Sequence, residues 1–224
     1  MKKNTFVAVA ATLALTVAVL MSGCGNSGSA ETQNNESVAE VSANVSQTAD
    51  LSDASTITVS DNETVTITKE GVYTLTGSAA NACVVVEAGD DDKVQLILDN
   101  VSIINSDQPC ILVENADKVL LLSSEGSSNT LSVSGQFSGD ADAVIYSRDD
   151  LELDGLGTVT ISSAEDGICS NDDLELLGGT WTVTASDTAM KAHDSIIASS
   201  GTFDLTAGND GLHAEDNDGA DALR

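Results

Sequence analysis

From residue 142 onward the chain repeats itself with a period of about 22 residues, and this repeat limits the possible folds more than any other feature of the sequence. Gly157, Gly179 and Gly201 stand one period apart, and each is followed by a threonine and then by an apolar residue. A period of this length is typical of a solenoid, in which each repeat buries its apolar side by stacking on its neighbours. We therefore expect like residues of successive repeats to form columns.

Apolar and polar residues alternate in short runs inside each repeat, which predicts strands and not helices. Examples are the runs 151–153 and 158–161, with glycine, asparagine or aspartate between such runs. Three such strands fill one repeat and bring stacked coils to about 4.8 Å from one another. The chain has a single proline, as expected where strand N–H groups join ladders. The sequence thus predicts an all-β fold, a parallel β-helix with one repeat per coil.

Strand-like runs also precede the regular repeats. Three alternating runs lie between residues 56 and 75, and we expect them to form an N-terminal β cap, because the open end of a stack is an exposed sheet edge. The last repeat stops at Arg224 in mid-coil. The predicted domain, residues 55–224, is therefore expected to be truncated at its C-terminal end.

Residues 1–23 predict a lipoprotein signal peptide, since two lysines precede a short apolar run that ends in small residues. The run closes on Met-Ser-Gly-Cys, which resembles a bacterial lipobox with Met21 where leucine is usual, and so implies acylation of Cys24. The alternative is ordinary secretion with a free Cys24. Residues 24–54 are rich in Ser, Asn and Glu and predict a disordered tether. The expected location is extracellular, lipid-anchored to the outer face of the bacterial cytoplasmic membrane.

The composition is strongly acidic. Asp and Glu number 36 against 8 Lys and Arg, which gives a formal net charge of −28. A field of that sign repels nucleic acid and anionic lipid and attracts cations. We therefore expect no nucleic-acid partner, and membrane contact only through the lipid anchor.

Acidic residues also recur in register with the repeat. Asp172, Asp194 and Asp216 stand one period apart, and on the other side of the short apolar run a second column holds Glu165 and Asp187. Carboxylates stacked about 4.8 Å apart repel one another by roughly 1 kcal/mol even in water. Ca²⁺ prefers such oxygen ligands and would offset the repulsion. The columns therefore favour calcium as a cofactor, and the alternative is an acidic turn whose charges point into solvent.

Few residues suit catalysis. Parallel β-helix pectate lyases combine Ca²⁺ with an Arg or Lys that removes the proton next to a uronate carboxylate. Arg148 and Lys191, each beside an acidic column, are the candidates for this role, and the alternative is a surface cation paired with its acidic neighbours. His193 and His213 are expected to be exposed turn residues. Tyr146 is expected to be exposed and is a candidate for contact with a sugar ring.

The other aromatic residues and the cysteines are predicted to be structural. Trp181 and Phe203 share one column of the repeat, so both are expected to face the interior. Cys83, Cys110 and Cys169 are odd in number and show no close pair, which argues against a disulfide framework and a Cys-rich metal site. We expect Cys83 and Cys110 to fill core space, and the alternative is a bond between these two on neighbouring coils.

Several stretches together resemble a known family. The stretches are GVYTLTGS at 71–78, VVVEAGDDDKVQLILDNVSI at 84–103, NADKVLLL at 115–122, AVIYSRDDLEL at 143–153 and NDGLHAEDND at 209–218. They are similar, in this order, to the clostridial polysaccharide-lyase-like β-helix lipoproteins described as carbohydrate-binding domain proteins. The resemblance implies a right-handed parallel β-helix, bound calcium, and adhesion to plant cell-wall glycans that include cellulose-like glucans and acidic pectin.

The columns and the resemblance together give a set of expected calcium ligands: Glu165, Asp166, Asp172, Asp173, Asp187, Asp194, Asp210 and Asp216. The leading functional expectation is calcium-dependent, non-catalytic binding of plant cell-wall polysaccharide, a cellulose-like glucan or pectin, at the bacterial cell surface. Pectate-lyase-like β-elimination on polygalacturonate is one alternative. A purely structural surface protein is another.

Overall fold

The computed structural model describes residues 53–215. The predicted signal peptide, the lipid attachment site Cys24, nearly all of the predicted tether and the predicted ligand Asp216 lie outside the described residues. Within the described part, no helix is long and apolar enough to cross a membrane.

The described chain is built from short strands joined by turns, as the alternating runs predicted. The strands are β1 (Ser55–Thr58), β2 (Thr64–Ile67), β3 (Gly71–Ala80), β4 (Cys83–Glu87), β5 (Lys93–Asn105), β6 (Ile111–Asn115), β7 (Lys118–Ser123), β8 (Ser128–Val133), β9 (Ala143–Ser147), β10 (Asp150–Gly155), β11 (Thr158–Ser163), β12 (Asp166–Ser170), β13 (Leu174–Leu176), β14 (Thr180–Ala185), β15 (Met190–Ala192), β16 (Ile196–Ala198), β17 (Thr202–Ala207) and β18 (Leu212–Ala214).

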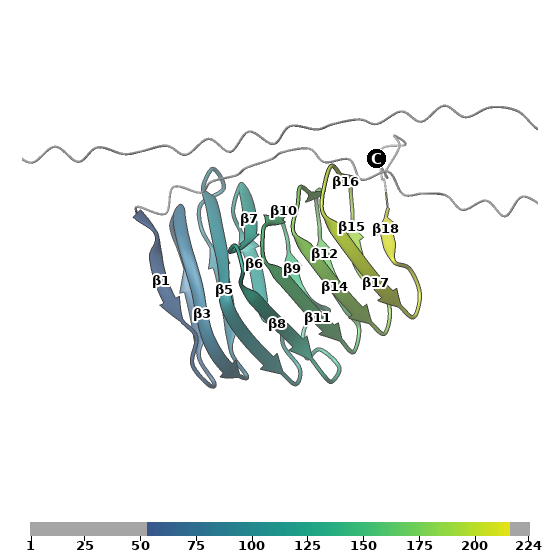
Figure 1. Cartoon of the computed structure of the whole chain (residues 1–224), viewed down its shortest axis with the longest axis horizontal. Coiled ribbons are helices and arrows are strands. Elements are labelled where there is room, and N and C mark those ends of the chain that lie inside the picture. The colour runs from purple at the N-terminus through teal and green to yellow at the C-terminus, as the bar shows by residue number, and fades with distance from the viewer. Residues whose placement is uncertain (1–52, 216–224) are drawn as a thin grey trace, which may run out of the picture. The chain divides into compact units, whose positions relative to one another are not determined.

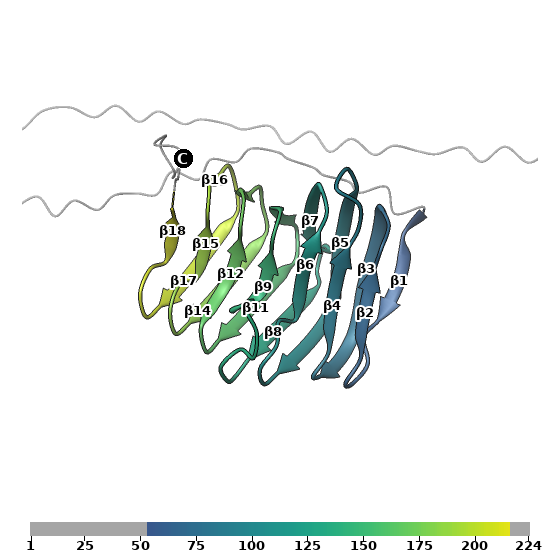
Figure 2. The same cartoon turned by 180° about the vertical axis from the view of Figure 1, so that it is seen from behind.

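These strands form two curved parallel sheets (Figures 1 and 2). The larger has eleven strands in the order β16-β13-β10-β7-β5-β8-β11-β14-β17, with β3 and β1 joined to it beside β5. The smaller has seven, in the order β18-β15-β12-β9-β6-β4-β2. Because β5 pairs with β7 through its first half and with β8 through its second, the larger sheet has two limbs. We call β7, β10, β13 and β16 the first limb, and β8, β11, β14 and β17 the second limb.

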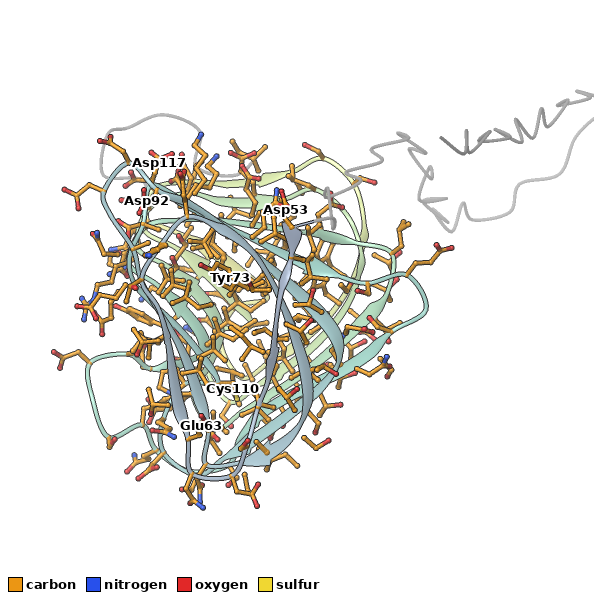
Figure 3. All side chains as sticks on the ribbon, turned by 90° about the vertical axis from the view of Figure 1, so that its left-hand side faces the viewer. Asp53, Glu63, Tyr73, Asp92, Cys110 and Asp117 are labelled. Atoms are coloured by element: carbon orange, nitrogen blue, oxygen red, sulfur yellow. The ribbon has the colours of Figure 1, made fainter. Side chains whose placement is uncertain are left out.

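The prediction of a single right-handed β-helix with an N-terminal cap is wrong. The all-β content and the parallel pairing hold, but the strands belong to two curved sheets, and the single strand β5 pairs with the first strand of each limb of the larger sheet. The expected cap strands are members of the sheets, since β1 pairs with β3 and β2 with β4, both in parallel. Figure 3 looks at the structure from the β1 side, where β1 lies over the interior side chains.

A local backbone feature explains why the long strand β3 was not anticipated. The pairing of β3 with β5 shifts between Leu75 and Gly77, and Gly77 has a φ of 94°, a conformation that glycine adopts readily. The strand therefore bends at this point without ending. Alternation of polar and apolar residues does not distinguish a bend of this kind from a turn between two strands.

The register of the repeat matches the observed pairing. Trp181 pairs with Phe203 on one side and with Val159 on the other, one repeat away in each direction. Trp181 is 0% exposed within the core between the sheets, and its indole Nε1 donates a hydrogen bond to the carbonyl oxygen of Gly178 at 3.0 Å. The prediction that Trp181 is a core residue is therefore confirmed, while Phe203 is only partly buried.

All three cysteines of the described chain are buried and free. Burial is the main cause that raises the pKa of Cys83, Cys110 and Cys169 to about 12, so the thiols stay protonated at neutral pH. The Cys110 thiol points to the carbonyl oxygens of Ile103 and Ser132 at 3.6 and 3.7 Å. Space filling is confirmed for Cys83 and Cys110, and the alternative bond between them is not formed.

Candidate functional site

One row of turns, which leads from the seven-stranded sheet into the first limb, carries closely stacked carboxylates. We call this set the acidic corner: Asp149, Asp150, Asp172, Asp173 and Asp194. The backbone N–H of Asp194 donates to the carbonyl oxygen of Asp172 at 3.3 Å, and that of Asp173 donates to Oδ1 of Asp150 at 3.3 Å. These bonds connect successive turns, so the acidic residues of neighbouring repeats lie side by side. Figure 3 shows the earlier members of the same row of turns, Asp92 and Asp117, close together.

The carboxylates of the acidic corner raise one another's proton affinity. The pKa of Asp172 is raised by burial first and then by the negative charges of Asp150 and Asp194. The pKa of Asp150 is also raised, mainly by burial, although a backbone hydrogen bond from Asp173 and the cation of Lys118 act against this. When neighbouring negative charges disfavour the ionised form of a carboxylate, a bound cation stabilises that form most. The acidic corner is therefore a candidate site for a cation.

The other predicted ligands within the described residues lie just before β12, β15 and β18 or at the first residue of β12, and they are Glu165, Asp166, Asp187 and Asp210. Asp166, which is 5% exposed, accepts a hydrogen bond from the backbone N–H of Thr188 at 2.8 Å, and its pKa is raised chiefly by burial. Asp166 begins β12, whereas Asp172 follows the end of that strand. At about 3.3 Å per residue the two positions are on the order of 15–20 Å apart. The seven predicted ligands within residues 53–215 therefore cannot all hold one common ion.

A calcium ion held by protein side chains alone does not fit these residues. Within residues 53–215, no three His, Cys, Asp or Glu side chains are grouped so that they could hold one metal ion. Several carboxylates already accept hydrogen bonds from neighbouring turns, as Oδ1 of Asp173 does from Ser195 Oγ at 2.6 Å. What the acidic corner offers is adjacent pairs such as Asp172 and Asp194. Calcium bound to such a pair needs further oxygens from backbone carbonyls, water or a ligand.

Lys118 is a residue of the candidate site that sequence reasoning missed. Its ammonium group lies 2.6 Å from Glu152 Oε1, 3.4 Å from Glu175 Oε1 and 3.8 Å from Asp150 Oδ2. The hydrogen bond to Glu152 is the main cause that raises the pKa of Lys118, so the residue stays charged. The lysine thus neutralises the side of the acidic corner that faces the first limb. The pairing of β7 with β10 brings it there, and no local sequence signal reports this.

Beside Lys118 the outer surface of the larger sheet is hollowed. The hollow measures about 220 Å³ and is lined by Lys93, Gln95, Lys118, Leu120 and Glu152 among others. Both lysines are paired with acidic residues, Lys118 as described and Lys93 with an aspartate at 3.4 Å. The hollow therefore offers no unpaired cation to an anionic ligand.

The outer face of the seven-stranded sheet gathers the other candidate residues. Tyr146, Cys169, Lys191 and His213 follow one another across β9, β12, β15 and β18. The expectation that Tyr146 is exposed is wrong, because its side chain is 8% exposed and its hydroxyl donates to Asn171 Oδ1 at 3.2 Å. The sequence could not show this burial, which depends on neighbours from other strands.

Arg148 and Lys191 are paired cations. Arg148 Nε lies 2.6 Å from Glu114 Oε2, and this hydrogen bond is the main cause that raises the pKa of Arg148. Burial alone would lower the pKa of Lys191, but the negative charges of Glu215 and Asp166 act against it, and the pKa is raised. Each cation is therefore held by a carboxylate of the protein, Arg148 by Glu114 and Lys191 by Glu215 at 3.4 Å. This arrangement matches the paired surface cations that the sequence offered as the alternative to catalysis.

The two histidines lie at the edge of the same face. His193 Nδ1 is 3.7 Å from Glu215, and His213 Nδ1 is 3.3 Å from Asp210. Their side chains are about two fifths exposed, 39% and 42% respectively. They are accessible surface residues with acidic neighbours. His193 lies in a turn as expected, whereas His213 belongs to β18.

The fold and these clusters define an all-β protein of two parallel sheets with strongly acidic turns. The family model for carbohydrate-binding domain-containing proteins matches residues 61–222, and the chain belongs to this family. A carbohydrate-binding domain-containing protein of Acetivibrio thermocellus is 32% identical over 116 residues. That match covers 49% of this chain and 41% of the relative, so the chain spans less than half the length of this relative.

A solved structure is also similar. It is the polysaccharide lyase-like protein from C. thermocellum, in a gadolinium derivative, with a TM-score of 0.68 and 30% sequence identity. The match covers 74% of this chain and 75% of that chain. The family resemblance inferred from the sequence is thereby confirmed.

Proposed function

We propose that the protein binds polysaccharide without cleaving it, and that Ca²⁺ at the acidic corner holds acidic glycans such as polygalacturonate. Membership in the carbohydrate-binding family supports the polysaccharide as partner. The observation that carries the calcium part is the stack of carboxylates around Asp172, whose charges are only partly compensated by Lys118. A neutral glucan is the second substrate class that the sequence suggested.

Charge explains why a cation is needed. The chain has a formal net charge of −28 and a polyuronate is itself an anion, so direct contact is repulsive. Calcium on the pair Asp172 and Asp194 would keep coordination positions open, which uronate carboxylates and hydroxyls would fill. Because residues 53–215 contain no three-residue ligand cluster, the protein alone should bind calcium weakly. Calcium and glycan should then strengthen each other's binding by the same factor.

The test measures polygalacturonate binding by calorimetry in calcium and in EDTA. We expect chelation to abolish binding, and Asp172→Asn with Asp194→Asn to weaken it about tenfold or more, equivalent to roughly 1.4 kcal/mol. Glu125→Gln removes one charge from an exposed turn away from the acidic corner and serves as the control. Binding that is unchanged by EDTA would refute the calcium part. Absence of any glycan binding would favour the structural surface protein.

A second assay addresses the lyase alternative. Polygalacturonate incubated with the protein and Ca²⁺ should give no rise in the ultraviolet absorbance of unsaturated uronides, because Arg148 and Lys191 are each paired with a carboxylate of the protein. A rise that is lost in Arg148→Ala or Lys191→Ala would instead establish the enzyme.

We also propose that the protein acts at the cell surface, anchored through an acylated Cys24. Support comes from the signal-like residues before it and the Ser- and Asn-rich stretch after it. Cys24→Ala should move the protein from the membrane fraction to the medium. Unchanged partition into membranes would contradict the anchor.

A further inference from the structure

The turns before β5, β7, β10, β13 and β16 carry an aspartate at the same place in five successive coils. We call this set the aspartate row: Asp92, Asp117, Asp149, Asp172 and Asp194. The backbone N–H of Asp117 donates to the carbonyl oxygen of Asp92 at 2.9 Å, and that of Asp194 donates to Asp172 at 3.3 Å (Figure 3). Three members of the acidic corner are therefore the later part of a longer row.

The residues that directly follow the aspartate row form a second row, which changes from basic to acidic along the stack. In order they are Lys93, Lys118, Asp150, Asp173 and Ser195. Lys93 pairs with Lys118 and Lys118 with Asp150, and the pairing of β10 with β13 and of β13 with β16 keeps the same register. The first two aspartates of the row thus have a lysine as the next residue, and the last three do not.

Lys118 stands where the basic and the acidic part of the second row meet. Its ammonium group is held by Glu152 at 2.6 Å, by Glu175 at 3.4 Å and by Asp150 at 3.8 Å. Glu152 and Glu175 pair with each other on β10 and β13, so the lysine of β7 reaches past the neighbouring strand to the one beyond it. The side chain of Lys118 is 26% exposed, so water screens its charge less than that of Lys93, which is 72% exposed.

The ammonium group of Lys118 marks a position for a positive charge among these three carboxylates. With the lysine in place, no three acidic, histidine or cysteine side chains within residues 53–215 are close enough to hold one metal ion. Ca²⁺ needs oxygens at about 2.3–2.6 Å, so the three groups would move inward by up to roughly 1 Å to bind it. Glutamate side chains are flexible, and the hollow of about 220 Å³ beside Lys118 leaves room for water molecules that complete the coordination. Without the lysine, a divalent ion can therefore take the place of its ammonium group.

We propose that Lys118 is a tethered counter-ion, which fills the cation position among the three carboxylates and keeps divalent ions out of it. Calcium is then confined to the later part of the acidic corner, around Asp172 and Asp194, where the second row supplies no lysine. This consequence rests on the proposed calcium-dependent binding of polysaccharide, and it makes Lys118 a positioning residue that decides where a uronate chain is attached. The counter-ion itself does not depend on that function, because it concerns only the charge balance of the three carboxylates.

The test compares calcium binding by calorimetry in the parent and in Lys118→Met, which keeps the unbranched side chain but not the charge. We expect the variant to gain a calcium site at least about tenfold tighter than any in the parent, because three carboxylates are vacated and the repelling ammonium group is gone. Lys118→Arg keeps the charge and should restore the calcium binding of the parent. Lys93→Met removes the lysine of the preceding coil, which is paired with the single carboxylate of Asp117 at 3.4 Å, and should gain no such site.

A second measurement follows the stability of the same proteins. Removal of the counter-ion leaves three carboxylates that repel one another, so Lys118→Met should melt below the parent in EDTA. Calcium that binds the folded variant should restore most of this difference, and it should raise the melting temperature of the parent by less. A variant that stays unfolded in calcium, or whose melting temperature responds to calcium as that of the parent does, would overturn the proposal.

The calorimetric outcomes separate the counter-ion from the proposed function. If Lys118→Met binds calcium no better than the parent, the counter-ion is refuted, even where the parent binds polygalacturonate with calcium. Equal gains in Lys118→Met and Lys118→Arg would also count against it, since the shape of the side chain and not its charge would then matter. A gain in Lys118→Met alone, together with polygalacturonate binding that EDTA leaves unchanged in the parent, would support the counter-ion and refute the calcium part of the proposed function.

Discussion

Replacing Trp181 by alanine should be among the most destabilising single changes in this protein. The side chain is 0% exposed and packs between Val159 and Phe203 of the neighbouring strands. Truncating a buried tryptophan costs about 3–5 kcal/mol. The substitution also removes the donor to the Gly178 carbonyl, and an unsatisfied buried acceptor adds about 1–3 kcal/mol where no water reaches it. A domain of this size is stable by about 5–15 kcal/mol, so the loss takes a large share.

The assay is urea denaturation followed by circular dichroism, since Trp181 is the sole tryptophan and its fluorescence is lost with it. Trp181→Phe removes the indole N–H and one ring of the side chain but keeps an aromatic ring in the core, and should cost roughly 1–2 kcal/mol. Phe203→Ala, in the same column but only partly buried, should cost about half as much as Trp181→Ala. An unchanged midpoint for Trp181→Ala, accompanied by lost glycan binding, would refute the core placement and show that the ring is a binding residue.

Three further predictions concern charge and backbone. Lys118→Met should destabilise the fold by about 2 kcal/mol in urea denaturation, because three carboxylates lose their shared cation. Lys93→Met, at a position that is 72% exposed, should have little effect. Equal effects of the two substitutions would contradict this prediction. Gly155→Ala should lower the melting temperature, since φ is 122° and a Cβ would meet the backbone of the neighbouring strand, at a cost of about 1–3 kcal/mol. The pKa values of Asp166 and Asp172 are raised in the folded state, so the folded protein takes up protons at a higher pH than the unfolded chain does. Folding is therefore stabilised as the pH falls from neutral toward the usual carboxyl range. In EDTA the melting temperature should therefore be higher at pH 5 than at pH 7.5, and the opposite order would show that these carboxylates are already compensated.

The candidate site was only partly predictable. The repeat spacing placed Asp172 beside Asp194, because residues one repeat apart are neighbours in a parallel ladder. It could not place Lys118, whose contact with Glu175 joins residues 57 positions apart. Nor could it show that Tyr146 is covered, since that depends on side chains from neighbouring strands. Such contacts depend on the order of the strands in the sheets, and a local sequence pattern does not determine that order.

The sequence by itself determined the strand content, the parallel register along the repeats and the burial of Trp181. The physical reason is that a fixed period pairs each residue with its counterpart in the next repeat, and alternation then decides which side faces the core. Only the tertiary structure decided that the strands form two sheets and that β1 and β2 are ordinary members of them. That choice depends on where the chain bends without breaking, as at Gly77, and on β5 pairing with β7 and β8 at once. The bend at Gly77 and the double pairing of β5 are favoured by contacts between strands far apart in the sequence. The residues of one repeat supply only one side of those contacts.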